Sequence, residues 1–445
     1  MVYGDLLDVH LMHNPCTTHT LSKTVRIEPL TGEPAGGAAR AAADAVARRS
    51  YGKLVAYLAA SCRDLAAAED ALSEAFAAAL GDWPRRGCPA NPEAWLLTVA
   101  RRRLVDQARR RQTRAAGAGT LALLAEGLAA AGTAPGLPDR RLGLLFACAH
   151  PALEPGVRAP LMLQAVLGLD AARIASAFLT SPAAMAKRLV RAKSRIRMAG
   201  IPFALPDAEE LAPRLDAVLE AIYAAFAEGW TDPGGTDAAR RDLVAEAIYL
   251  ARLVAGLLPD APETLGLLAL LLHAEARRPA RRDAAGAYVP LGWQDPGRWD
   301  AAMIAEAEAL LVRASRLGAI GRFQLEAALQ SAHVHRGRGG VADWPRVVEL
   351  YDALLALSAS PVVAVNRAVA VAGRDGPAAG LAALDAVAGD PRLAEYQPYW
   401  AARADLLARS GAVEPARAAY GMAIGLERDP AVRSFLQESR AALPG

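Results

Sequence analysis

The stretch Leu169–Arg197, LDAARIASAFLTSPAAMAKRLVRAKSRIR, contains two short amphipathic segments that are separated by a tight turn. Asp170 stands where its side chain can cap the first segment. Ser181 and Pro182 begin the second segment, with serine at the capping position and proline at the first helical position. Two short helices joined by so brief a turn predict a helix-turn-helix.

The second of these helices is strongly basic. Residues 180–197 hold six basic side chains and no acidic one. Met185, Leu189 and Ile196 form a predicted inward stripe, and basic residues, Lys193 among them, cover the other sides. In a helix-turn-helix the start of this helix enters the major groove of DNA. The predicted contacts to base edges and phosphates come from Ser181, Ala183, Ala184, Lys187, Arg188, Arg191 and Arg195. The alternative is a solvated helix packed on its own domain.

A second basic helix is predicted earlier in the chain. Residues 100–114, ARRRLVDQARRRQTR, carry seven arginines against Asp106 alone. They follow a predicted loop rich in proline and glycine over Asp82–Pro92. This combination suits contact with duplex phosphates beside a partly opened strand. Trp95, at the start of the helix, is interpreted as a core residue rather than a stacking platform.

An acidic helix face precedes the arginine-rich helix. The pattern becomes helical from residue 38 to residue 80, and the carboxylates of this segment are Asp64, Glu69, Asp70 and Glu74. Carboxylates so close to a DNA-binding helix are explained as a separate docking face for a basic protein partner. The simpler alternative is a solvated acidic face.

Composition favours an all-α protein. The chain has 445 residues, enough for two or more domains, and its 53% hydrophobic fraction is rich in alanine while aromatic residues make up only 5%. Residues 1–198 hold 26 basic and 16 acidic groups, whereas residues 199–445 hold 24 and 31. This asymmetry predicts a front half that binds a polyanion. Four scattered cysteines and the lack of a long apolar run predict a soluble cytoplasmic protein.

The back half shows a repeat pattern. A large–small–large order typical of a tetratricopeptide helix pair appears near the end of the chain, at Trp400, Ala404, Leu407, Gly411, Ala416, Tyr420 and Ala423. Half of the pattern recurs upstream at Val347, Tyr351, Leu354 and Leu357. Breaks between helices are predicted near residues 232–237, 277–294, 336–343 and 374–377. A stack of helical hairpins is favoured over a bundle without repeats.

Taken in order, these segments resemble a bacterial RNA polymerase sigma factor of the extracytoplasmic-function group. The resemblance rests on EDALSEAFAAALGDWP, NPEAWLLTVARRRLVDQARRR, RRLGLLFACAHPALEP and LDAARIASAFLTSPAAMAKRLVRAKSRIRMAGIPF. The remainder, including YWAARADLLARSGAVEPARAAYGMAI, resembles a tetratricopeptide-like extension of one subgroup. The implied organisation is a poorly ordered arm at 1–37, a region 2-like domain at 38–114, a flexible linker at 115–138, a region 4-like domain at 139–205 and the helical extension at 206–445.

The resemblance also implies roles for residues. Asp70, Ser73 and Glu74 would bind the β′ clamp helices of core RNA polymerase, although the family usually has glutamine where Ser73 stands. The loop at 84–91 would capture a flipped base of the minus-ten box. The implied minus-ten contacts are Arg85, Arg86, Asn91, Arg101, Arg102, Arg103, Arg109 and Arg110. Lys187, Arg188 and Arg191 would read the minus-thirty-five box, and the β flap is a further implied partner.

No enzymatic chemistry is expected from the motifs. His333 and His335 form a histidine pair without Cys or acidic neighbours at a familiar metal-ligand spacing, so neither a metal nor a cofactor is predicted. Cys148 and His150 are interpreted as packing residues. The rival hypotheses are a helix-turn-helix regulator that acts without polymerase and an interaction scaffold. In the favoured hypothesis the extension is a regulatory module that can bind a protein partner, and no membrane is involved.

Overall fold

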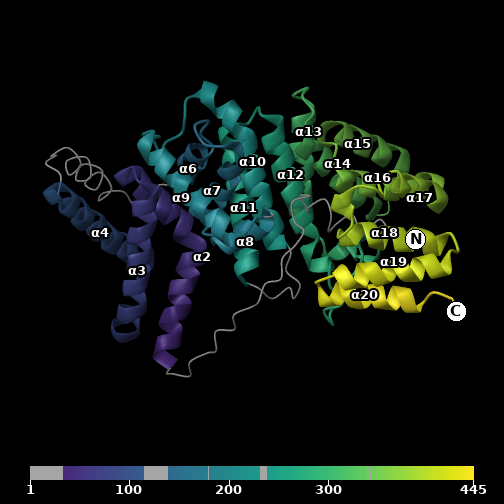
Figure 1. Cartoon of the computed structure of the whole chain (residues 1–445), viewed down its shortest axis with the longest axis horizontal. Helices are drawn as coiled ribbons and strands as arrows, with labels where there is room; N and C mark the ends of the chain where they lie inside the picture. The colour runs from purple at the N-terminus through teal and green to yellow at the C-terminus, as the bar shows by residue number, and fades with distance from the viewer. Residues whose placement is uncertain are drawn as a thin grey trace. The chain divides into compact units, whose positions relative to one another are not determined.

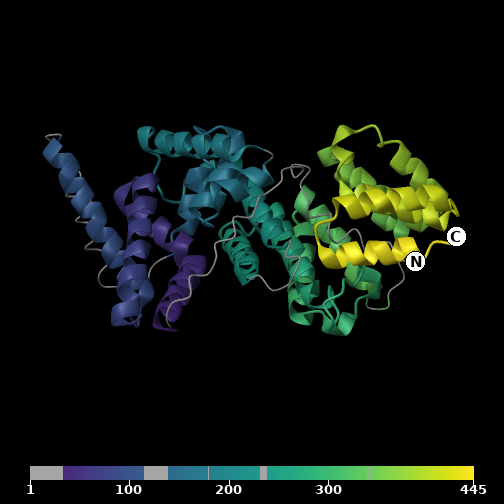
Figure 2. The same ribbon diagram turned by 60° about the horizontal axis from the view of Figure 1, so that its bottom comes forward.

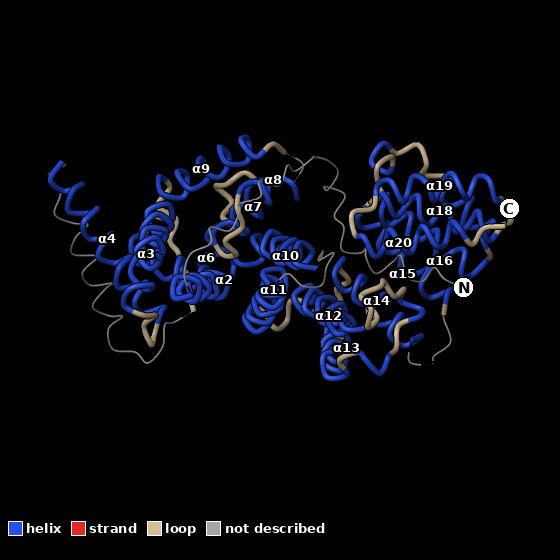
Figure 3. Tube along the Cα trace, turned by 90° about the horizontal axis from the view of Figure 1, so that it is seen from below, coloured by secondary structure: helices blue, strands red, loops and turns tan. Residues whose placement is uncertain are grey.

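The computed structural model describes residues 34–114, 139–178, 180–230, 238–337, 339 and 343–444. Within these ranges the chain forms helices joined by turns and no strand, apart from one isolated bridge between Arg282 and Tyr288 (Figure 3). The all-α prediction is therefore confirmed. Most of the predicted N-terminal arm, and the predicted linker with its short helix around residues 121–128, lie outside the described residues.

The chain divides into two compact units. The N-terminal unit contains His19–Ala225 and Arg241–Ala247, and the C-terminal unit contains Phe226–Arg240 and Ile248–Gly445. Two helices, α10 (Ala208–Trp230) and α11 (Ala238–Leu257), contribute residues to both units. The boundary between residues 205 and 206 stays a prediction.

Three long helices open the N-terminal unit: α2 (Pro34–Cys62), α3 (Leu65–Arg86) and α4 (Pro92–Arg114) (Figure 1). The helical pattern predicted over residues 38–80 is divided between α2 and α3, because the chain turns at Arg63, whose φ is 56°. Asp64 then caps α3 by accepting a hydrogen bond from the Ala67 amide at 3.2 Å. A residue in the left-handed region followed by a capping carboxylate ends one helix and begins the next.

The predicted loop over Asp82–Pro92 is shorter than expected. Helix α3 continues to Arg86 with Pro84 inside it, and it ends at Gly87, whose φ is 83°. Trp83 is only 2% exposed and its ring meets that of Trp95 edge-on at 5.6 Å. Burial of Trp83 against Trp95 offsets the loss of one backbone hydrogen bond, which proline cannot donate within a helix. Trp95 is half-buried, in keeping with the packing role predicted for it.

Four shorter helices follow in the same unit: α6 (Arg141–Cys148), α7 (Pro155–Ala165), α8 (Ala171–Ala177) and α9 (Pro182–Met198). The predicted caps are present. Asp170 Oδ1 accepts hydrogen bonds from two amides of α8, and Ser181 Oγ accepts one from Ala184 at 3.2 Å. The predicted inward stripe of α9 is also buried, at Met185, Leu189 and Ile196.

The two groups of helices pack against each other. Helix α2 contacts α6 and α7, and α9 contacts α3 as well as α7 and α8. A Cβ atom placed on Gly52 of α2 would lie 1.9 Å from the carbonyl oxygen of Val166, at the end of α7. Glycine is therefore required at residue 52 for this close approach.

The C-terminal unit is a succession of helices in which each helix contacts the next. They are α12 (Pro262–Arg277), α13 (Ala301–Ser315), α14 (Arg322–Gly337), α15 (Trp344–Ser358), α16 (Pro361–Asp375), α17 (Pro377–Asp385), α18 (Gln397–Arg409), α19 (Val413–Leu426) and α20 (Pro430–Ala441). The last three run side by side at the end of the chain (Figure 2). The predicted breaks after Arg277 and before Pro377 are confirmed, and the one at residues 232–237 lies outside the described residues.

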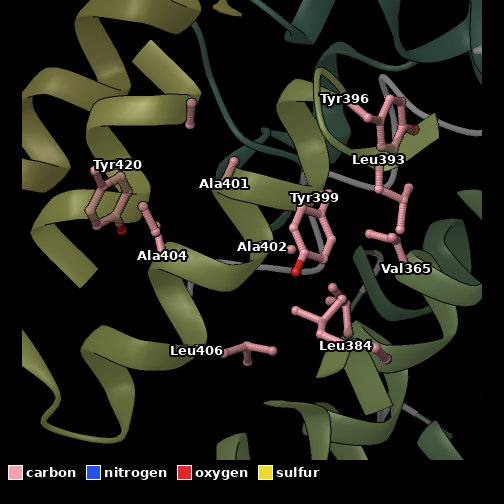
Figure 4. Packing of buried hydrophobic residues seen from close by; sticks show 14 of the residues in the cluster. Val365, Leu384, Leu393, Tyr396, Tyr399, Ala401, Ala402, Ala404, Leu406 and Tyr420 are labelled. Atoms are coloured by element: carbon pink, nitrogen blue, oxygen red, sulfur yellow. The ribbon is translucent and has the colours of Figure 1, made fainter. Parts of the chain in front are cut away.

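One apolar cluster joins α16 to α20 in this unit (Figure 4). Ala404 and Tyr420 of the predicted repeat pattern lie in it, and Gly411 makes the turn between α18 and α19 with φ 77°. Upstream, Tyr351 and Leu354 are buried in a second cluster, whereas Leu357 is 57% exposed. The last position of the upstream pattern therefore does not contribute to the core.

Candidate nucleic-acid and protein interface

The outward side of α9 presents most of the residues predicted to contact DNA. The exposed ones are Ser181, Ala183, Ala184, Lys187, Arg191 and Arg195. Arg188 is half-buried, and its Nη2 donates a hydrogen bond to the Gly156 carbonyl at 3.2 Å. The first turns of α9 thus combine small side chains with a cationic one, as a helix that approaches base edges requires.

The second half of α9 carries two basic residues that point elsewhere. Lys193 forms an ion pair with Glu69 of α3, and the two side chains are only 13% and 12% exposed. Arg197 Nη1 lies 3.6 Å from Asp64 Oδ2 at the start of α3. The prediction that Lys193 belongs to the outer basic surface of α9 is wrong. Its partner is distant in sequence, so no local pattern indicates the pairing.

Two opposing influences act on the pKa of the Glu69 carboxyl. Burial raises the pKa of Glu69, and the nearby Lys193 ammonium opposes this rise. Burial likewise raises the pKa of Tyr51 on α2, and the negative charges of Glu69 and Asp70 raise it further. A desolvated pair of this kind depends on both partners, because removing one leaves a buried charge without its counterion.

The arginines of α4 are not equivalent. Arg102, Arg103, Arg109 and Arg110 are exposed. Arg101 is half-buried, donates a hydrogen bond from Nη2 to the Tyr57 hydroxyl at 2.5 Å, and stands 5.1 Å from the centre of the Tyr57 ring. Arg101 is therefore held against α2, whereas its neighbour Arg102 is available to a partner.

Acidic and basic residues meet in a groove between α3 and α4. Arg103 Nε lies 3.2 Å from Glu74 Oε2, and both side chains are about half exposed. The groove is lined by Asp70, Ala71, Glu74, Arg103, Asp106, Gln107 and Arg110. Ser73 is exposed on the same helix as Asp70 and Glu74. The structure thus brings the three predicted protein-binding residues together, directly beside predicted DNA-binding arginines.

The short loop between α3 and α4 is flanked by the remaining predicted residues. Arg85 Nε donates to the Gly81 carbonyl at 3.0 Å, and Arg86, which is 80% exposed at its side chain, lies 3.4 Å from Asp82. Asn91 caps α4, since its Oδ1 accepts a hydrogen bond from the Ala94 amide at 3.0 Å. Asn91 therefore has a structural role in addition to the role predicted from the resemblance.

The two histidines of the predicted pair in the C-terminal unit differ in their exposure to solvent. His333 is buried in α14, and this burial lowers its pKa to about 3, whereas His335 is exposed. Among the described residues no group of His, Cys, Asp and Glu could hold a metal ion. No helix in the described part of the chain is both long and apolar enough to cross a membrane.

The groove between α3 and α4 lies within a part of the chain that matches a known protein family. Residues 46–114 match sigma-70 region 2, and residues 214–315 match a family of unknown function, DUF6596. A protein of Rhizobium meliloti (strain 1021), "Uncharacterized protein R00370", is 40% identical over 395 residues, which cover 87% of this chain and 92% of that protein. No solved structure matches the chain. The region 2 match includes all of α3 and α4.

Proposed function

We propose that this chain, whose residues 46–114 match sigma-70 region 2 and which shares a family with the Rhizobium meliloti protein, is a sigma factor of the extracytoplasmic-function group. It binds core RNA polymerase in the cytoplasm, recognises promoter DNA and directs initiation of transcription. The observation that carries this proposal is the groove between α3 and α4, where exposed carboxylates and exposed arginines adjoin within the region 2 match.

The carboxylates suit a basic protein partner. Asp70, Ser73 and Glu74 are exposed, and they follow one another at helical spacing on α3. Charge complementarity steers association and fixes the register of an interface. We assign these residues to the β′ clamp helices of core polymerase, and the region 4-like helices to the β flap.

The arginines of α4 suit the phosphates of the minus-ten region. Each basic side chain that neutralises a phosphate releases a counterion and strengthens binding at low salt. The loop between α3 and α4, at residues 87–91, would hold a base flipped out of the melted strand. Unstacking a base costs a few kcal/mol, and these contacts offset that cost.

Helix α9 suits the minus-thirty-five box. Its first turns would enter the major groove, with the exposed Lys187 and the half-buried Arg188 near base edges and Arg191 near the phosphate backbone. The helix pair α8 and α9 would act as the helix-turn-helix of a region 4-like domain. No catalytic residue is required, because polymerase performs the chemistry.

The C-terminal unit would regulate this activity. Its succession of helices, each in contact with the next, supports a tetratricopeptide-like stack. Such stacks bind proteins on an extended surface, and residues 199–445 carry an excess of acidic groups. The module would thus bind a protein partner and set the activity of the DNA-binding unit.

The test is promoter-specific initiation with purified components. The full chain should co-elute with core polymerase and support run-off transcription from a promoter mapped by transcript start sites after induced expression. Asp70→Lys with Glu74→Lys should abolish co-elution. Lys187→Glu with Arg191→Glu should preserve co-elution and abolish initiation. Glu438→Lys, an exposed change on α20, is the matched control and should leave both intact.

The two rival functions give different outcomes. A helix-turn-helix regulator would bind duplex DNA and show no affinity for core polymerase. An interaction scaffold would bind neither. Either result would overturn the proposal.

A further inference from the structure

We propose that residues 278–300 form a strap that closes the helical stack of the C-terminal unit, by joining its last helix, α20, to its first helices. The strap connects α12 to α13. Arg282 of the strap and Asp429 of α20, which pair across the joint, are 147 residues apart in the chain. This inference concerns the C-terminal unit alone and does not rest on the function proposed above.

The strap is longer than most connections within a compact domain, and such long segments usually have a function of their own. Its own hydrogen bonds give it order. Asp283 Oδ1 accepts hydrogen bonds from the amides of Ala285 and Ala287, at 2.8 and 2.9 Å. The Val289 amide donates to the Arg281 carbonyl at 2.9 Å. The strap therefore holds a defined shape, so it can connect one end of the stack to the other.

One part of the strap is buried against the first helices of the unit. Leu291 and Trp299 are 3% and 5% exposed, and they lie in one apolar cluster with residues of α12, α13 and α14. A Cβ atom placed on Gly337, at the end of α14, would lie 2.2 Å from Cη2 of the Trp299 ring. Glycine therefore permits the close approach of Trp299 to α14. These contacts anchor the strap at the beginning of the stack.

Another part of the strap contacts the last helix. Tyr288 packs against the apolar cluster of α16 to α20, and its ring meets the Phe435 ring of α20 edge-on, with ring centres 5.6 Å apart. The ring of Trp293 also meets the Phe435 ring edge-on, at 6.0 Å. Arg282 Nη2 donates a hydrogen bond to Asp429 Oδ2, and the two side chains are only 22% and 18% exposed. Aromatic contacts and a partly buried ion pair thus join the strap to α20.

A stack with joined ends should behave differently from an open one. In an open stack each helix meets only its neighbours along the chain, so the terminal helix opens locally without affecting distant helices. Here α20 also contacts a segment that is anchored on α12, α13 and α14, so opening of either end breaks the same joint. Release of the joint would free the curvature of the stack and change the extended surface on which such stacks bind proteins.

Hydrogen–deuterium exchange of the full chain, read by mass spectrometry, tests the closure from both ends. Phe435→Ala on α20 should raise exchange roughly tenfold in the strap as well as in α20, because it removes both aromatic contacts. Tyr288→Ala on the strap should in turn raise exchange in α20, since coupling between two sites is reciprocal. Helix α15, whose buried residues belong to a different apolar cluster, should keep its protection.

Asp429→Asn tests the ion pair without removing a helix cap. Asp429 Oδ1 accepts a hydrogen bond from the Ala431 amide at 2.9 Å, and asparagine caps a helix about as well as aspartate. Loss of the charge should raise exchange in the strap roughly threefold, less than the effect of Phe435→Ala. Gln437→Ala, at an exposed position of α20, is the matched control and should leave exchange in the strap unchanged.

Independent behaviour of the two ends would overturn the closure. In that case Phe435→Ala would raise exchange in α20 alone, and Tyr288→Ala would raise it in the strap alone. If Phe435→Ala fails to fold, Phe435→Leu gives the same comparison, because it keeps an apolar side chain and removes the aromatic contacts. Failure of the chain to bind core polymerase would remove the proposed function and leave this result unaffected, since exchange is measured on the protein alone.

Discussion

Glu74 on α3 and Arg103 on α4 form an ion pair, with Oε2 and Nε 3.2 Å apart. The carboxylate predicted to grip polymerase is therefore held by an arginine predicted to follow promoter DNA. Because both side chains are about half exposed, the pair contributes little to the stability of the fold. Each side chain can therefore leave the other to bind a partner molecule. This pair links the two surfaces on which the proposed function depends.

Glu74→Ala should weaken polymerase binding without unfolding the protein. We expect a change of no more than about 0.5 kcal/mol in the free energy of unfolding, because the ion pair is exposed. The affinity for core polymerase should fall roughly tenfold, about 1.4 kcal/mol, as a charge is lost from the interface. Denaturant unfolding and titration of labelled protein with core polymerase measure the two effects. Unchanged affinity would contradict the role assigned to Glu74.

Arg101 and Arg102 should respond in opposite ways to alanine. Arg101→Ala removes the hydrogen bond and the ring contact to Tyr57, so we expect a loss of about 1–2 kcal/mol in stability. Arg102→Ala should leave stability unchanged and reduce the slope of DNA affinity against salt by about one unit. Thermal unfolding and binding isotherms at several salt concentrations separate the two. Similar behaviour of the two variants would contradict this assignment.

Gly52 and Gly81 are a matched pair of helical glycines. Gly52→Ala would place a Cβ atom 1.9 Å from the Val166 carbonyl oxygen, so we expect loss of packing between α2 and α7 and a cost of 1–3 kcal/mol, about that of overpacking. Nothing lies within 4 Å of a Cβ atom on Gly81, so Gly81→Ala should stabilise α3 by about 0.5–1 kcal/mol. Opposite shifts in Tm are expected. A neutral Gly52→Ala would show that α2 and α7 do not approach in this way.

Asp405 on α18 should make stability depend on pH. Burial raises the pKa of this carboxyl to about 7, and Arg409 only partly opposes the rise. In the unfolded chain the carboxyl ionises near pH 4, so the folded state holds the extra proton between about pH 4 and pH 7. Its contribution to stability is therefore greatest below about pH 4, declines as pH rises to about 7, and is then constant.

The substitution Asp405→Asn removes this dependence. The variant should exceed the wild type in Tm at pH 8, and the difference should narrow at pH 5. Asp216→Asn, at an exposed position of α10, is the control and should leave the Tm nearly unchanged. If the difference in Tm between the wild type and Asp405→Asn were the same at pH 5 and pH 8, the pKa of Asp405 would lie near its ordinary value.

Glu246 ties α11 to the N-terminal unit. The Arg141 guanidinium is buried and pairs with both Asp139 and Glu246. Glu246→Gln should cost about 1–3 kcal/mol, since a buried charge loses one of two partners. Glu209→Gln, an exposed change on α10, should be neutral in the same thermal unfolding assay. Equal Tm values for the two variants would count against this role.

The Glu246 contact also affects how a truncation of the C-terminal unit should be designed. Deleting residues 206–445 removes Glu246 together with the rest of the C-terminal unit, so a change in promoter activity would combine the loss of the Glu246 contact with the loss of any regulation by that unit. A deletion that begins after residue 257 keeps α10 and α11, so it tests the proposed regulation without removing the Glu246 contact. We expect this shorter deletion to alter transcription from the mapped promoter in cells at matched protein levels. An unchanged transcript profile would contradict regulation by the C-terminal unit.

Local signals in the sequence determined the helical character of the chain and several of its details. Capping by Asp170 and Ser181, and the apolar stripe of α9, follow from side chains that act within three or four residues of each other. The same logic failed at Arg63 and Pro84. There the helix boundary depends on a left-handed backbone and on burial of Trp83 against Trp95, which no local pattern records.

Tertiary structure alone decided which charges are available. The sequence made Arg101 and Arg102 equal and placed Lys193 with the other basic residues of α9. Packing holds Arg101 on Tyr57 and Lys193 on Glu69, because the partners come from helices 44 and 124 residues away in the chain. Helical periodicity specifies what a segment buries, whereas the side chain that meets a charge across an interface depends on how separate helices pack.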